Sequence, residues 1–117
     1  MSRADWFSDA DAASLITDLG DPIIIRWPDG GVAQFNAVDA TEDWRTSGDG
    51  DGRGHSFSGF DVVIDIHTSH LPTGVGKAQL VPNGTLERVG VDSPAKPLRI
   101  SDYHPQGQGI VALVCEP

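Results

Sequence analysis

Apolar residues recur with two different periods along this chain, and the change of period separates one helix from a series of strands. Within residues 1–20, the apolar residues that share one face of a helix are Ala12, Leu15, Ile16 and Leu19. Gly20 and Pro22 then end the helical pattern. We expect an amphipathic helix that packs on a sheet. Trp6 and Phe7 lie off this face, so a helix that binds a partner is the alternative.

From residue 21 onward the apolar residues alternate with polar ones, which is typical of strands. The predicted strands are Ile23–Trp27, Val32–Val38, Phe57–Ile66, Lys77–Val81, Thr85–Val91, Leu98–Tyr103 and Ile110–Cys115. Pro28–Gly31 has the composition of a turn and predicts a hairpin. Asn83-Gly84, after Pro82, predicts a second, tight hairpin.

The third predicted strand has the clearest alternation in the chain. Its expected buried face consists of Phe60, Val62, Ile64 and Ile66. Its expected solvent-exposed face consists of Asp61, Val63, Asp65 and His67. Such a strand is typical of an antiparallel sheet with one face on the core and one in water.

The predicted fold is mainly β: a small barrel or sandwich of six or seven short strands, with one N-terminal helix and a long mobile loop. We expect a single domain over 1–117, with the helix in 1–20, the barrel in 21–117 and the flexible loop in 39–56. Within that loop, Ser47–Gly54 contains four glycines in eight residues, a composition that does not build a core.

Acidic residues outnumber basic ones, 17 Asp and Glu against 8 Lys and Arg, for a formal net charge of −9. This balance argues against binding nucleic acid through its phosphates, which requires a basic face. The one cysteine, Cys115, cannot form an intrachain disulfide and suits a reducing compartment. With no recognisable signal peptide or membrane-spanning run, we expect a soluble protein made in a cytoplasm.

The motifs that could hold a metal or a phosphate are incomplete. Asp49-x-Asp51 begins like a calcium loop, but Arg53 and Phe60 stand where oxygen ligands are needed. The histidines that could form a metal cluster are His55, His67, His70 and His104, but they lack the spacing of known sites. Gly74–Lys77 resembles a phosphate loop without its first glycine, its Ser or Thr, or a following helix. We therefore expect no cofactor.

Catalytic groups are equally scarce. Cys115 lies near the end of an apolar strand, where a thiol is usually inert. No serine lies in a Gly-x-Ser-x-Gly turn, and Asp61 and Asp65 fall on a face expected to be solvated. The sequence therefore predicts a protein that is not an enzyme.

The order of the elements provides a further indication. After the helix, the strand pair and the irregular loop come Val62–His67, Leu71-Pro72, Lys77–Val81, Leu86–Val91 and the closing segment Tyr103–Leu113 (Tyr-His-Pro-Gln-Gly-Gln-Gly-Ile-Val-Ala-Leu). This layout resembles the head–tail joining (stopper, or head-completion) proteins of lambda-like tailed bacteriophages over nearly the whole chain. Gly76-Lys77 stands where that family has Gly-Asp, and Gln106–Gly109 replaces an Asp-containing turn.

The resemblance implies a ring, expected to be a hexamer, in the neck of the virion and assembled in the cytoplasm of the host. Such a ring would contact the portal and adaptor on the head side and a tail terminator or tail-tube protein on the tail side. DNA would pass through its negative lumen without specific binding. The loop would become ordered on assembly, which makes Asp49, Asp51, Arg53 and His55 the expected partner-contact residues. No membrane is implied.

Two alternatives remain open at this point. One is another phage structural protein, such as a tail-tube, terminator or baseplate component. The other is a metal-dependent barrel that binds a small molecule through some of the four histidines.

Overall fold

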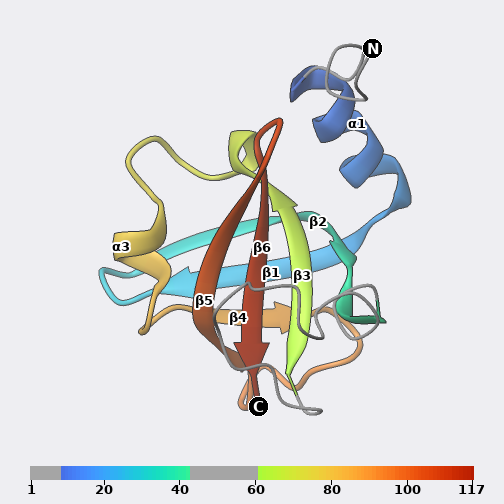
Figure 1. Ribbon diagram of the computed structural model, residues 1–117. Coiled ribbons are helices and arrows are strands. Elements are labelled where there is room, and N and C mark those ends of the chain that lie inside the picture. The colour runs from blue at the N-terminus through green and yellow to red at the C-terminus, as the bar shows by residue number, and fades with distance from the viewer. Residues whose placement is uncertain (1–8, 43–60) are drawn as a thin grey trace, which may run out of the picture.

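The strands of the chain close into a barrel in the computed structural model, which describes residues 9–42 and 61–117 (Figure 1). The described elements are α1 (Asp9–Leu19), β1 (Asp21–Trp27), β2 (Gly31–Asp39), β3 (Val62–His67), the 3-10 turn η2 (Thr68–His70), α3 (Lys77–Leu80), β4 (Thr85–Arg88), β5 (Leu98–Gly107) and β6 (Ile110–Glu116). The strand order is β1-β2-β3-β6-β5-β4, with every pair antiparallel. The predicted small β-barrel with an N-terminal helix is confirmed.

The barrel consists of two three-stranded sheets joined by two short seams. β1 pairs with β2 from Asp21↔Ala37 to Trp27↔Gly31, and β4 lies on the other side of β1. β6 lies between β3 and β5 in the second sheet. The seams are much shorter: β2 and β3 share two paired positions, and so do β4 and β5. Few hydrogen-bonded positions therefore join the two sheets. Each sheet places alternate side chains on its inner face, and the two inner faces pack against each other in the core.

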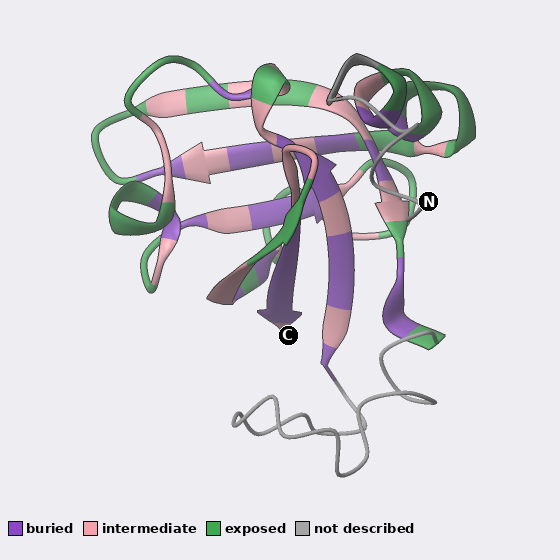
Figure 2. Cartoon of the chain, turned by 45° about the horizontal axis from the view of Figure 1, so that its top comes forward, coloured by how far each residue is buried: buried purple, intermediate pink, exposed green. Residues whose placement is uncertain are grey.

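Side chains fill the interior, as expected for a barrel of this size. The buried core residues are Ile23, Ile25, Trp27, Ala37, Ile64, Ile66, Leu71, Leu80, Leu86, Leu98, Ile100, Val111, Leu113 and Cys115. Every strand contributes to this set, and β6 is buried along most of its length (Figure 2). Among the described residues, side chains thus pack the centre of the barrel.

Helix α1 packs on β2 and β3 through a narrower face than the sequence predicts. Ala12 and Ile16 are buried, but Leu15 is 42% and Leu19 is 72% exposed. The amide of Asn36 on β2 donates to the carbonyl of Thr17 at 2.9 Å and ties the helix to the sheet. The prediction of a helix on a sheet is confirmed, whereas the expectation that Leu15 and Leu19 share its buried face is wrong.

The outer face of β3 is largely buried, contrary to prediction, although Asp65 is only half-buried. Val63 is fully buried in a second apolar cluster, with Ala40 after β2 and Ala112 and Val114 of β6. His67 is buried as well. Ile64 and Ile66 face the core as predicted, Val62 is half-buried against it, and Phe60 lies outside the described residues. The period-2 pattern could not show that neighbouring elements also cover the outer face.

Lys77–Val81 was predicted as a strand and is instead the short helix α3 followed by an extended residue. The amide of Gly76 donates to Oε1 of Gln79 at 2.7 Å, which caps the first turn. Leu80 then inserts into the core and closes one end of the barrel. Residues 82–84 therefore connect a helix to β4, and the predicted second hairpin does not form.

Other boundaries shift by a few residues. β4 ends at Arg88 rather than Val91, and β5 continues to Gly107, so the polar turn is shorter than expected. Asp39 belongs to β2, and the two residues after it are buried, so the irregular segment begins later than predicted. Residues 43–56 of the predicted loop 39–56 and residues 57–60 of the predicted strand Phe57–Ile66 lie outside the described residues.

Candidate functional site

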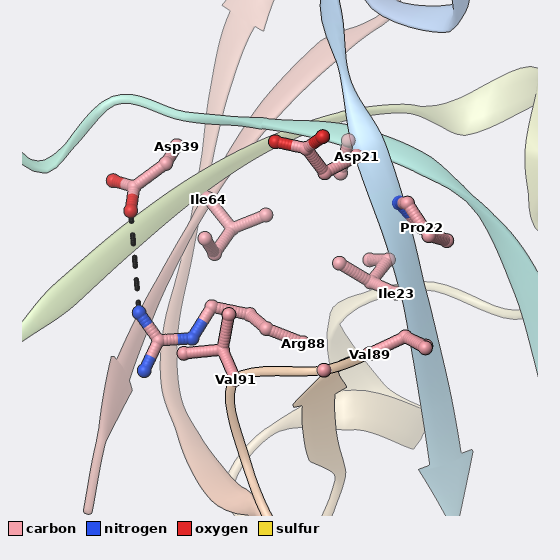
Figure 3. A pocket seen from close by; sticks show the side chains of 10 residues that line it. Asp21, Pro22, Ile23, Asp39, Ile64, Arg88, Val89 and Val91 are labelled. Atoms are coloured by element: carbon pink, nitrogen blue, oxygen red, sulfur yellow. Dashed lines mark ion pairs between the residues drawn. The ribbon is translucent and has the colours of Figure 1, made fainter.

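The barrel end away from α3 opens into a pocket of about 470 Å³ (Figure 3). Its lining residues are Asp21, Pro22, Ile23, Ala37, Asp39, Ile64, Arg88, Val89, Gly90 and Val91. They come from β1, β2, β3, the end of β4 and the segment that follows β4. The pocket therefore spans both sheets and the seam between β2 and β3.

Strand alternation explains why charged side chains face this pocket. Asp21 lies two residues before the core residue Ile23, and Asp39 lies two residues after the core residue Ala37. Arg88 is paired with Ile23 across the β1–β4 ladder. Side chains two residues apart on a strand point to the same face of a sheet, and so do side chains directly opposite each other on paired strands. The side chains of Asp21, Asp39 and Arg88 therefore continue the inward face of the barrel to its open end.

The Arg88–Asp92 pair organises the segment after β4. The guanidinium donates through Nε and Nη2 to the two carboxylate oxygens of Asp92 at 2.9 Å, and the backbone N–H of Arg88 donates to the same side chain at 2.8 Å. These hydrogen bonds lower the pKa of Asp92 and raise the pKa of Arg88 against the opposing effect of burial. Gly90 supplies a positive φ of 82° within the turn that the pair closes.

Asp39 holds a carboxylate at the opposite side of the pocket. Its Oδ1 accepts hydrogen bonds from the backbone N–H of Thr41 at 2.9 Å and from Oγ1 of Thr41 at 2.5 Å. Its Oδ2 lies 4.0 Å from Nη1 of Arg88, across the pocket. Figure 3 shows Asp39 and Asp21 along one side, with Ile23 and Ile64 between them and the valines of the other side.

The local charge is negative. Asp92 neutralises Arg88, which leaves Asp21 and Asp39 as the excess charge. Asp21 is exposed and has no side-chain partner among the residues that the structure describes. The floor is apolar, because Ile23, Ala37 and Ile64 are buried core residues. The pocket thus combines an apolar floor with two carboxylates, which suits binding.

Cys115 lies in the core near the Arg88–Asp92 pair and is fully buried. Burial raises the pKa of its thiol to about 12, so the thiolate that a nucleophile requires is not formed near neutral pH. The lining residues include no serine, threonine, cysteine or histidine. The described lining therefore lacks the Ser–His or Cys–His pair that many acyl-transfer enzymes use.

The histidines do not form a metal site in the described part of the chain. Nε2 of His67 lies 2.9 Å from the carbonyl of Gln108, and its Nδ1 accepts from the backbone N–H of Ser69 at 3.2 Å. Both ring nitrogens are therefore in use, which identifies the Nε2–H tautomer. His70 stacks on Phe35, with ring centroids 5.3 Å apart.

His104 lies elsewhere, on β5, where its Nε2 is 2.8 Å from Oδ2 of Asp102. The burial of Asp102 opposes ionisation, but a hydrogen bond from the N–H of Tyr103 and the proximity of His104 outweigh it and lower the pKa of Asp102. The fourth histidine, His55, lies outside the described residues.

Gly74–Lys77 does not form a phosphate loop either. A helix does begin at Lys77, contrary to expectation, but α3 has only four residues.

The partner-contact residues predicted from the sequence, Asp49, Asp51, Arg53 and His55, lie outside the described residues, and that prediction stays a prediction. The sequence reasoning missed the pocket. Two signals could have indicated it: Asp21 and Asp39 occur in phase with the apolar faces of their strands, and Arg88 precedes Asp92 by four residues around a glycine.

Comparison with known protein families, with curated proteins and with solved structures gives no match to the chain. Within residues 9–42 and 61–117, no helix is long and apolar enough to cross a membrane.

Proposed function

We propose that the chain is a structural protein of a tailed bacteriophage: a head–tail joining, or stopper, protein that closes the DNA-filled head and offers a docking surface for the tail. The observation that carries this proposal is a closed six-stranded barrel preceded by a helix, the architecture that the sequence resemblance implies, although Lys77–Leu80 is a helix where that layout has a strand. The absence of serine, cysteine and histidine among the lining residues of the pocket also favours a structural role over hydrolysis by a Ser–His or Cys–His pair.

The packed interior supports a particular mode of assembly. DNA could not pass through a barrel whose centre is filled by side chains, so it would pass through the hole of a ring of barrels, expected to be a hexamer. With a net charge of −9 per subunit, such a hole would repel the DNA backbone and let it slide. The portal and adaptor would lie on one side of the ring, and a tail terminator or tail-tube protein on the other.

Exposed apolar side chains provide contact points for these neighbours. Leu15 and Leu19 on α1 and Val89 and Val91 beside the pocket are exposed, although they are large and apolar. Exposed apolar residues that occur in groups are typical of protein interaction sites. The loop that contains Asp49, Asp51, Arg53 and His55 would contribute the polar part of the contacts in the neck of the virion.

The test is a phage that lacks the gene for this protein, viewed by electron microscopy. We expect filled or leaking heads and complete tails that accumulate separately, and complementation with the wild-type gene should restore joined particles. Tubes of abnormal length or missing tails would indicate a tail-tube, terminator or baseplate protein instead. Joined, infective particles from the deletion would overturn the proposal.

A further inference from the structure

We propose that the pocket at the open end of the barrel binds a lysine or arginine side chain that a neighbouring protein presents. The identification of that neighbour as another neck protein rests on the proposed function. The binding chemistry rests on the pocket alone.

The charge of the pocket favours a cation. The carboxylate of Asp92 occupies Nε and Nη2 of Arg88, and the remaining Nη1 faces Asp39. The arginine is therefore already compensated, and Asp21 and Asp39 set the sign of the field that a ligand meets. An anion would have to approach these two carboxylates. Three groups placed to share a metal ion are not found in the described part of the chain.

The apolar surface beside the two carboxylates favours a long side chain over a small cation. The floor of Ile23, Ala37 and Ile64 is buried and apolar, and Val89 and Val91 extend apolar surface along the other side. Lysine and arginine carry a positive group on an aliphatic stem that packs on apolar surface while the charge stays near water. Such a side chain could lie along the floor with its charged end between Asp21 and Asp39 (Figure 3).

The pocket is also held in shape before binding. The N–H of Val89 donates to the carbonyl of Pro22 at 3.1 Å, which fixes the segment after β4 against β1. Thr41 fixes the carboxylate of Asp39 with two hydrogen bonds. A preformed site loses less conformational entropy when it binds.

The first experiment is a titration of the ¹⁵N-labelled protein with n-pentylammonium, an analogue of the lysine side chain, followed by NMR. We expect saturable shifts of the amides of Ile23, Ile64 and Val89. n-Pentanol, of similar size but uncharged, should bind more weakly. Equal effects of the two probes, or no saturable shift at these amides, would overturn the inference.

The matched variant is the double substitution Asp21→Asn and Asp39→Asn, whose amide oxygens can still accept hydrogen bonds. We expect it to weaken n-pentylammonium binding about three- to tenfold, the range for two surface charge pairs. Asp29→Asn removes one charge at the other end of β1, where the amide oxygen can still accept from the N–H of Gly31, and should leave binding unchanged. A comparable loss in both proteins would show that only net charge matters and would overturn the inference.

The two proposals fail in different ways. If the double variant binds n-pentylammonium weakly but supports normal joining of heads and tails in the complementation assay, the pocket does not serve the neck contact and the inference fails, while the proposed function stands. If the deletion itself yields joined particles, the proposed function fails, and the NMR titration still decides the chemistry of the pocket. Loss of joining with the double variant, against normal joining with Asp29→Asn, supports both.

Discussion

At the scale of single residues, the ion pair between Arg88 and Asp92 shapes one side of the pocket. The side chain of Asp92 is only 10% exposed and accepts hydrogen bonds from both the guanidinium and the backbone of Arg88. A bidentate pair of this kind fixes direction as well as distance. It therefore sets the path of Val89–Val91 and, through them, one side of the pocket.

Asp92→Asn should reduce stability at neutral pH by about 1–3 kcal/mol, because hydrogen bonds to a charged group are lost. The folded-state pKa of Asp92 lies below its usual value of 3.8. Its contribution is therefore fully present above that usual value and is lost as the pH falls through the lowered pKa. Urea unfolding of both proteins between pH 7 and pH 2.5 should show the difference shrinking at the acid end.

The control is Asp29→Asn, a substitution in an exposed turn that should leave stability nearly unchanged at both pH values. A stability difference for Asp92→Asn that stays constant down to pH 2.5 would contradict the role given to its charge.

At the scale of elements, the turn between β5 and β6 is fixed by the end of β3. Gln108 and Gly109 have positive φ angles of 55° and 77°, as the two central residues of a type I′ hairpin require. His67 lies against this turn and bonds to the carbonyl of Gln108. The hairpin and the end of β3 are therefore coupled through the buried imidazole and through the N–H of Thr68, which donates to the carbonyl of Gly109 at 2.8 Å.

A pair of glycine substitutions tests this coupling. At Gly109, an added Cβ would lie 2.4 Å from Nε2 of His67, whereas at Gly107 it would meet nothing within 4 Å. Both positions have positive φ, so Gly107→Ala should cost about 1 kcal/mol from backbone conformation alone. Gly109→Ala should cost about 1–3 kcal/mol more, because the His67 hydrogen bond must shift. Thermal unfolding measures both, and equal losses would contradict the coupling.

The elements also show what the sequence can and cannot specify. The β-branched residues of Ile23–Trp27 and the alternation in Val32–Val38, with a turn composition between them, were enough to predict the first hairpin. Alternation was not enough to assign Lys77–Leu80, because these four residues alternate like a strand but are also good helix formers. The segment is a helix, and in it Leu80 is buried in the core. The position of Arg88 in the pocket depends on the register between β1 and β4, which pairs it with Ile23. A single sequence does not specify which residues of two distant strands are paired.

At the scale of the whole molecule, the barrel behaves as two sheets with unequal connections. The β3–β6 ladder contains six paired positions, whereas the β4–β5 seam contains two. Regions with few cross-strand bonds open more readily than the centre of a sheet. The seams are therefore where the molecule should first open.

Hydrogen exchange measured by NMR tests this expectation. Amides in the centre of the β3–β6 ladder, such as those of Ile64 and Leu113, should be the most protected. Amides at the β4–β5 seam, around Thr85, should exchange at least about tenfold faster if opening there costs about 1.4 kcal/mol less. Uniform protection around the barrel would show that it opens only as one unit.

The long strand β5 has a consequence for how copies can associate. Only Leu98 and Arg99 of β5 pair with β4, so the part from Ser101 to Gly107 has a second edge that no described strand covers. β5 contains two irregularities in its register with β6, and within the uncovered part it contains Pro105, which has no N–H to donate. Irregular, proline-bearing edges resist the addition of a further strand. Copies joined at this edge would therefore have to meet through side chains, as separable blocks rather than as one continuous intermolecular sheet.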